Sequence, residues 1–143
     1  MPYEFLEDEA IADIAFRAWG GSPEETFASA ADATMNVMVE DLDSIRPSEE
    51  RAFKLENDAL DLLLFDLLQE LIYYKDSEQL LLRTPEVEIE TQGDRYILKA
   101  TARGERLDPA RHRTRVDVKA VTLHRFRVEK IGQGWEAYVI LDV

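Results

Sequence analysis

The first part of the chain switches from a strand-like to a helix-like spacing of apolar residues. Within residues 5–19, the segment IADIAFRAW repeats its apolar positions every two residues, which predicts a strand with two different faces. A pair of glycines ends it. The motif SPEE at residues 22–25 then combines a serine N-cap, a proline at the first helical position and a glutamate three residues after the serine. Apolar residues follow at helical spacing, so a helix is expected to about residue 41.

A second, richer helical pattern lies in the middle of the chain. After a turn at Arg46-Pro47-Ser48, residues 52–55 alternate briefly and predict a weak strand. Residues 59–76, ALDLLLFDLLQELIYYKD, place leucines in a broad stripe with most acidic residues off it. Asn57 or Asp58 is expected to cap this helix. So apolar a stripe predicts a core helix that lies on a sheet.

From residue 86 onward, strand patterns replace the helical ones. Residues 86–91 and 95–105 flank Gln92-Gly93-Asp94, and residues 116–131 and 134–143 flank Gly132-Gln133-Gly134, which predicts two hairpins. The polar, basic segment LDPARHRT at residues 107–114 is expected to be the loop between them. Together the patterns predict one α+β domain over residues 1–143, with a largely antiparallel or mixed sheet and two main helices packed on one face.

Composition supports a globular protein in a reducing compartment. The chain has 143 residues, 45% of them apolar, and no cysteine, which excludes disulfides, thiolate zinc sites and a cysteine nucleophile. The start MPYEFLEDEA lacks the basic and apolar regions of a signal peptide. No apolar stretch approaches the length of a membrane span. We therefore expect a cytoplasmic protein without membrane partners.

The charge is strongly acidic and unevenly distributed. The net charge is −13; residues 1–90 hold 23 acidic and 6 basic side chains, whereas residues 91–143 hold 7 acidic and 11 basic ones. Stable binding to a nucleic-acid backbone needs clustered lysine and arginine and is not expected. An acidic first part suits a basic partner or a cation, or simply keeps the protein soluble.

Familiar enzyme motifs are absent from the sequence. It has no P-loop, GxGxxG, HExxH or GxSxG motif, and the acids at residues 40–43 lack the glycine and distant glutamate of an EF-hand loop. Those acids are expected to solvate a helix end. His112 and His124 are the only histidines, so the sequence offers few residues for a histidine-based acid–base pair. We interpret His124 as structural.

Two aspartates at unusual positions are the strongest chemical signal. Asp13 lies inside the first predicted strand and Asp142 inside the last, next to the terminal carboxylate of Val143. Charges in apolar strands are normally paired, hydrated or bound to metal. On neighbouring strands these groups would form an all-oxygen site, which favours Ca²⁺ or Mg²⁺. Lys119, in the apolar segment VDVKAVTLH, is an equally good partner for one aspartate, so a structural Asp–Lys pair remains an alternative.

Several segments, in order, resemble the archease family over nearly the whole chain. The most specific are ADIAFRAWG, VKAVTLH and the terminal VILDV; the others are FLEDEAIADIAFRAWG, SPEETFASAADATMNVM, LLLFDLLQELIYYKD, VDVKAVTLHRFRV and GWEAYVILDV. The resemblance implies a non-enzymatic accessory protein of the RtcB-type tRNA-splicing RNA ligase. Such proteins promote guanylate transfer onto a ligase histidine, support multiple turnover and can broaden nucleotide use.

The resemblance also implies roles for particular residues. The family's metal site, usually described with calcium, falls on Asp13, Asp142 and Val143, with one divalent cation per chain, and its functional lysine falls on Lys119. One departure concerns the segment EDEAIAD, residues 7–13, which stands where family members read like DHTAD. The missing histidine puts any role of that residue in doubt, the two added residues change the approach to the site, and Asp8 or Glu9 could reach into that space.

Two rival functions and one rival site follow from the residues. A metal-dependent phosphohydrolase or nuclease could use Asp13 and Asp142 directly, although no acid–base partner is evident. Alternatively, the cluster of Asp13, Lys119 and Asp142 is only structural, in an interaction module. The basic triplet at residues 111–113 is interpreted as a solvated connection rather than an RNA contact.

Overall fold

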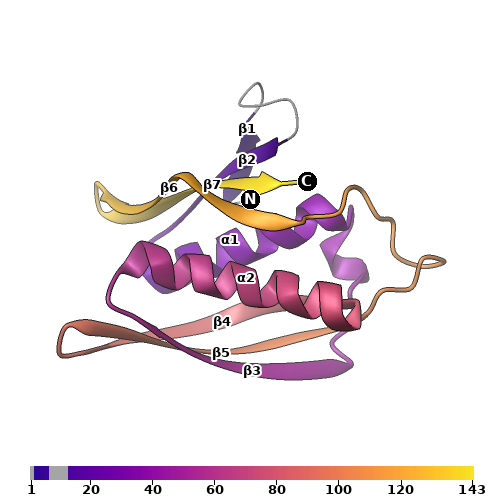
Figure 1. The fold of residues 1–143 in the computed structure, drawn as a ribbon, viewed down its shortest axis with the longest axis horizontal. Helices are drawn as coiled ribbons and strands as arrows, with labels where there is room; N and C mark the ends of the chain where they lie inside the picture. The colour runs from indigo at the N-terminus through magenta and orange to yellow at the C-terminus, as the bar shows by residue number, and fades with distance from the viewer. Residues whose placement is uncertain (1, 7–12) are drawn as a thin grey trace.

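The helices of this protein lie between two antiparallel sheets. The structure, a computed structural model, describes residues 2–6 and 13–143. In this part of the chain the order of elements is β1-β2-α1-η1-β3-α2-β4-β5-β6-β7. Figure 1 shows a sheet at the top, the two α-helices across the middle and a second sheet below. Each sheet therefore turns one face to the helices and the other to solvent.

The first sheet joins both ends of the chain. Its strands have the order β1-β2-β7-β6, and every neighbouring pair is antiparallel. The strands are β1 (Tyr3–Leu6), β2 (Asp13–Gly20), β6 (Ala120–Ile131) and β7 (Gly134–Asp142). The predicted first strand is thus β2, and β1 is an additional strand that pairs with it. Because β2 and β7 are the central strands, the first and last parts of the sequence lie side by side.

The second sheet is built from the middle of the chain. Its strands are β3 (Glu49–Asn57), β4 (Leu80–Gln92) and β5 (Arg95–Arg106), in the order β3-β5-β4. Strand β4 begins six residues before the predicted start at residue 86. Its register shifts between Arg83 and Glu86. Pro85, which has no N–H group to donate, lies in that shift and obscures the strand pattern.

Helix α1 (Pro23–Met38) begins at the predicted cap. The hydroxyl of Ser22 accepts a hydrogen bond from the Glu25 amide at 3.2 Å, and the Glu25 carboxylate accepts one from the Gly21 amide at 2.7 Å. The serine cap is thus confirmed, and the Glu25 carboxylate reaches back to the amide one residue before the cap. The helix ends three residues before the expected position because Val39 is extended and forms a β-bridge with Thr114.

Helix α2 (Leu60–Glu78) has the predicted apolar stripe but not the predicted cap. Its N-cap residue is Ala59, which has no capping side chain, so the expectation of Asn57 or Asp58 was wrong. The Asn57 side chain instead accepts a hydrogen bond from the Ala59 amide at 3.1 Å and so turns the chain into the helix. The 3₁₀-helix η1 (Leu42–Ser44) follows α1.

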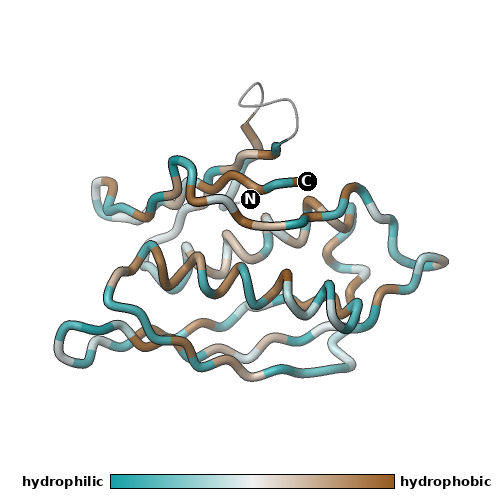
Figure 2. Tube along the Cα trace, in the orientation of Figure 1, coloured by the Kyte–Doolittle hydropathy of each residue, from teal (hydrophilic) through white to brown (hydrophobic). Residues whose placement is uncertain are grey.

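The core lies between the helices and the inner faces of the two sheets. Figure 2 shows apolar residues along α2 and the strands that face it, whereas the tip of the β4–β5 hairpin is hydrophilic. The largest fully buried side chains are Phe16, Phe27, Met35, Leu63, Leu64, Leu67, Leu68, Leu71, Leu80, Leu82, Leu98 and Leu141. The predicted α+β class, the antiparallel pairing and the two main helices are confirmed. The helices cover one face of each of two sheets.

The connections follow the predicted turns with one extension. Both hairpins turn at glycines with positive φ, Gly93 (+62°) and Gly132 (+59°), a conformation that glycine adopts without strain. The loop after β5 continues to residue 119, beyond the predicted end at residue 114. Lys119 therefore lies directly before β6, not inside a strand as expected. No helix in the described residues is long and apolar enough to cross a membrane.

Candidate metal-binding tip

Strands β2 and β7 bring the two unusual aspartates together. Asp13 is the first residue of β2 and Asp142 the last residue of β7, and the register pairs them directly. Residues opposite each other in antiparallel strands point to the same face, with about 5 Å between their Cβ atoms. Both side chains are half-buried. Two carboxylates so placed repel each other unless a cation lies between them.

Val143 and Lys119 complete the tip. Val143 follows Asp142 directly and packs against the core with its side chain half-buried. The amide of Lys119 donates a hydrogen bond to the carbonyl oxygen of Asp142 at 2.8 Å, while its side chain is exposed. We call Asp13, Lys119, Asp142 and Val143 the acidic tip. All four residues that the sequence singled out therefore lie at the same end of the first sheet, either in its strands or directly next to them.

The donor chemistry of the tip fits a hard divalent cation. Ca²⁺ binds oxygens at about 2.3–2.6 Å, so two ligand oxygens on opposite sides of the ion lie at most about 5 Å apart. That span matches directly opposed aspartates. Among the described residues, no three His, Cys, Asp or Glu side chains come together to hold a metal. The resemblance to the family implies the carboxylate of Val143 as a further ligand, whereas Asp8 and Glu9 lie outside the described residues.

The described residues supply no charged partner for the aspartate pair. No ion pair within residues 2–6 and 13–143 joins Lys119 to Asp13 or Asp142. Lys119 contacts Asp142 through backbone atoms instead. The ion pair that the structural Asp–Lys alternative expects is therefore not formed in this part of the chain.

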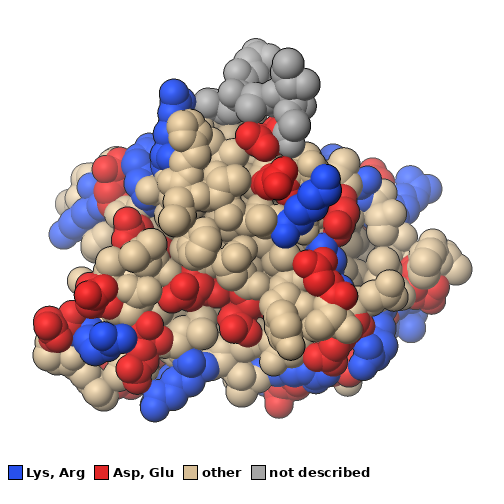
Figure 3. All heavy atoms as spheres, viewed as in Figure 1, with Lys and Arg blue, Asp and Glu red and all other residues tan. Residues whose placement is uncertain are grey.

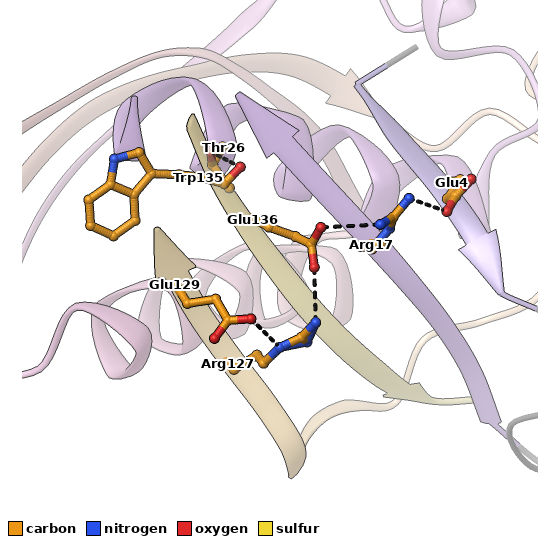
Figure 4. Close-up of polar contacts among 7 residues, drawn as sticks. All are labelled: Glu4, Arg17, Thr26, Arg127, Glu129, Trp135 and Glu136. Carbon is orange, nitrogen blue, oxygen red and sulfur yellow. Dashed lines mark hydrogen bonds and ion pairs between the residues drawn. The ribbon is translucent and has the colours of Figure 1, made fainter. Parts of the chain in front are cut away.

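A charged network elsewhere on the same sheet face contrasts with the tip. Glu136 of β7 accepts hydrogen bonds from Arg17 of β2 at 3.2 Å and from Arg127 of β6 at 2.9 Å (Figure 4). Arg17 also binds Glu4 of β1 at 2.6 Å, and Arg127 binds Glu129 at 3.0 Å. Anions and cations alternate across all four strands. The network holds together the sheet that carries the tip.

The sequence interpretation overlooked this network, although part of it was visible. Arg17 lies four residues after Asp13 on the same strand, so period-two alternation places both on one face. Its partner Glu136 could not be assigned without the strand order. Figure 4 also shows Trp135 of β7, whose carbonyl oxygen lies 3.5 Å from the Thr26 hydroxyl of α1. This contact joins the sheet to the start of α1.

The two histidines occupy different surroundings, and neither lies in the tip. His124 is exposed, in the stretch of β6 where the register shifts between Thr122 and Arg127. His112 is only 2% exposed, and its Nδ1 accepts a hydrogen bond from the Asp108 amide at 2.9 Å. Burial lowers the pKa of His112, and the positive charge of Arg111 lowers it further.

The basic triplet at residues 111–113 is partly structural. Arg111 forms an ion pair with the buried Glu105 of β5 and donates a hydrogen bond to the Ser44 carbonyl oxygen at 2.7 Å. The Glu105 carboxylate also accepts a hydrogen bond from the Arg46 amide. Arg111 therefore holds two loops together rather than projecting into solvent, whereas Arg113 is exposed.

The charge pattern elsewhere agrees with the sequence interpretation. The Asp41 side chain accepts a hydrogen bond from the Asp43 amide at 3.0 Å, so Asp41 caps η1, while the exposed Asp43 carboxylate pairs with Arg83. Figure 3 shows acidic and basic side chains mixed over the visible face rather than gathered in one basic stripe. A basic stripe is the usual mark of a nucleic-acid backbone site.

Comparisons with known proteins agree over the full length. The model of the Archease protein family matches residues 3–143. Protein archease from Pyrococcus abyssi is 39% identical over 136 residues, which covers 94% of this chain and 95% of that protein. Protein archease from Methanopyrus kandleri is 36% identical over 143 residues and covers 100% of both.

Two solved structures have the same fold. The solution structure of protein 1598 from Methanobacterium thermoautotrophicum superimposes with a TM-score of 0.86 at 34% identity and covers 99% of each chain. The crystal structure of an archease from Thermotoga maritima, described as a possible chaperone, has a TM-score of 0.65 at 23% identity and covers 96% of each chain. The second likeness concerns the fold alone.

Proposed function

Since this chain belongs to the archease family, we propose that it is a non-enzymatic activator of an RtcB-type tRNA-splicing RNA ligase. In this proposal it promotes guanylylation of the ligase and multiple turnover, and it broadens the ligase's nucleotide use. The observation that carries the proposal is the direct pairing of Asp13 with Asp142 beside the chain end. An acidic group of this kind has no evident purpose in the fold itself, because it costs stability.

The acidic tip would hold one divalent cation, Ca²⁺ or Mg²⁺. Asp13 and Asp142 would provide one carboxylate each, and Val143 the terminal carboxylate. A hard cation there would supply positive charge that phosphate oxygens recognise. The strand pairing of β2 and β7 holds the two aspartates in place before any ion arrives, so little chain entropy is lost on binding.

The partner surface that suits this tip is basic. A ligase cleft that handles RNA phosphates, GTP and metal ions needs positive charge, and a chain with a net charge of −13 is attracted to it. Asp13 and Asp142 would orient the protein with the tip toward that cleft. The exposed ammonium group of Lys119 would contact phosphate or balance the carboxylates.

A ligation assay with the cognate ligase tests the proposal. Multiple-turnover ligation should rise when the wild-type protein is added and should not rise with Asp142→Ala, whose fold is checked by circular dichroism. Single-turnover ligation by pre-guanylylated ligase should change little. Asp94→Ala is the matched control, since Asp94 is an exposed aspartate at a hairpin tip. Full stimulation by Asp142→Ala would reject the role of the tip.

The rival enzyme function has its own assay. The purified protein is incubated with RNA or nucleotides and Mg²⁺ or Mn²⁺ in the absence of ligase. An accessory protein leaves these substrates intact. Hydrolysis that disappears in both Asp13→Asn and Asp142→Asn would instead support a metal-dependent phosphohydrolase or nuclease.

A further inference from the structure

The peptide group between Val118 and Lys119 is held from both sides. Its carbonyl oxygen accepts a hydrogen bond from the Lys75 ammonium group of α2 at 2.8 Å. Its N–H group donates to the carbonyl oxygen of Asp142 in β7 at 2.8 Å. A single planar peptide group therefore links a cation on the helix to the backbone of a tip aspartate.

Ion pairs and burial hold the Lys75 side chain in position. Its ammonium group lies 2.5 Å from the Asp117 carboxylate and also pairs with Asp76, and its side chain is only 12% exposed. Burial alone would lower the pKa of Lys75, but the hydrogen bonds that its ammonium group donates to Asp117 and Asp76 raise the pKa above its usual value. Lys75 therefore keeps its charge, and a cation on a carbonyl oxygen polarises the peptide and strengthens its N–H as a donor.

Further contacts hold the same short segment. The side chains of Val118 and Val121 are buried in the core, at 0% and 5% exposure. The Val121 amide donates a hydrogen bond to the Gln69 side chain of α2 at 3.2 Å. Lys119 is the exposed residue between these anchors. These contacts hold the backbone of Lys119 beside Asp142, while its side chain points to solvent, where a partner could reach it.

We propose that Lys75 is a positioning residue of the acidic tip, which holds the Val118–Lys119 peptide against Asp142 and so keeps Lys119 in place. Lys75 itself touches neither a cation nor a ligase in this proposal. Its contribution to ligation rests on the proposed function, but its contribution to the geometry of the tip does not. The two are separable by experiment.

Amide hydrogen exchange in the free protein tests the geometric part. In Lys75→Met, which removes the charge and keeps a long side chain, exchange at the Lys119 amide should rise about tenfold or more, the scale of a lost charge-assisted hydrogen bond. Amides of β5 should keep their wild-type rates. The matched control is Lys54→Met, because Lys54 is an exposed lysine on the other sheet.

The outcomes decide the proposal in either direction. Unchanged exchange at Lys119 would overturn it, and so would a uniform increase at all amides, which indicates only a general loss of stability. If Lys75→Met does not fold, Lys75→Gln, which retains a neutral donor, is measured by the same criterion and should show a smaller local increase.

Ligation then separates this inference from the proposed function. Lys75→Met should raise the concentration needed for half-maximal stimulation of the ligase without abolishing stimulation, whereas Lys54→Met should match the wild type. If Asp142→Ala stimulates fully, the proposed function fails, and the exchange at Lys119 still decides whether Lys75 positions the tip.

Discussion

Asp13 and Asp142 lie directly opposite each other on β2 and β7, so two carboxylates emerge together from one face of the sheet. Like charges in this arrangement destabilise a sheet. Within the described residues no ion pair offsets the repulsion, whereas on the same face Glu136 forms ion pairs with both Arg17 and Arg127. The cation of the proposed function would neutralise this repulsion.

Neutralising one carboxylate should stabilise the metal-free protein. Asp142→Asn removes the repulsion and is expected to raise the free energy of unfolding by about 0.2–1 kcal/mol. Urea unfolding in the presence of a chelator measures it, with Asp94→Asn as the control at an exposed hairpin position. A loss of stability in Asp142→Asn would instead favour a structural ion pair with a cation such as Lys119.

Calcium should stabilise the wild type through both aspartates. An ion that binds only the folded state adds about 2.7 kcal/mol at a hundredfold excess over its dissociation constant, and the thermal midpoint rises accordingly. Differential scanning calorimetry with Ca²⁺ and with Mg²⁺ measures the shift. Asp13→Asn and Asp142→Asn should each lose most of it. Equal shifts in wild type and variants would place the ion elsewhere.

The arginine network should contribute more than a surface ion pair. The Glu136 side chain is 12% exposed and accepts from both Arg17 and Arg127. Glu136→Gln leaves two guanidinium groups without their shared anion and is expected to cost about 1–3 kcal/mol in the free energy of unfolding.

The matched control for this network is Glu129→Gln. Glu129 binds Arg127 as well, but its side chain is 46% exposed, so the expected cost is below about 0.5 kcal/mol. Urea unfolding measures both variants. Equal costs would show that burial of Glu136 does not matter.

Stability should fall with acid partly because of His112. Burial, followed by the charge of Arg111, lowers the folded-state pKa of His112 below its ordinary value of 6.5. The unfolded chain therefore takes up the proton first as the pH falls through 6.5, so stability present above that pH is lost toward the lowered folded-state pKa. Unfolding free energies measured from pH 8 to pH 5 should decline less in His112→Gln, which has no proton to gain. Parallel curves for the two proteins would contradict this assignment.

Local patterns predicted the elements well where one short-range rule dominated. The capping box at Ser22 and the leucine stripe of α2 were identified because helix caps and helical faces depend on residues within a few positions. The start of β4 was missed because Leu80, Leu81 and Leu82 are a short run of one apolar residue type, which shows neither the period-two alternation nor the β-branched residues of a typical strand. Only Gln79, in the left-handed conformation at φ 52°, marks the end of the helix.

The sequence by itself determined the two helices, the two glycine hairpins and the identity of the unusual aspartates, because each of these depends on chemistry within a few residues. Only the tertiary structure decided that the strands divide into two sheets, that Asp13 faces Asp142, and that Lys75 reaches the Val118 carbonyl oxygen. Those relationships join residues from 43 to 129 positions apart. Strand order and helix packing, which arise from burial of the whole core, determine them, and no local pattern encodes that order.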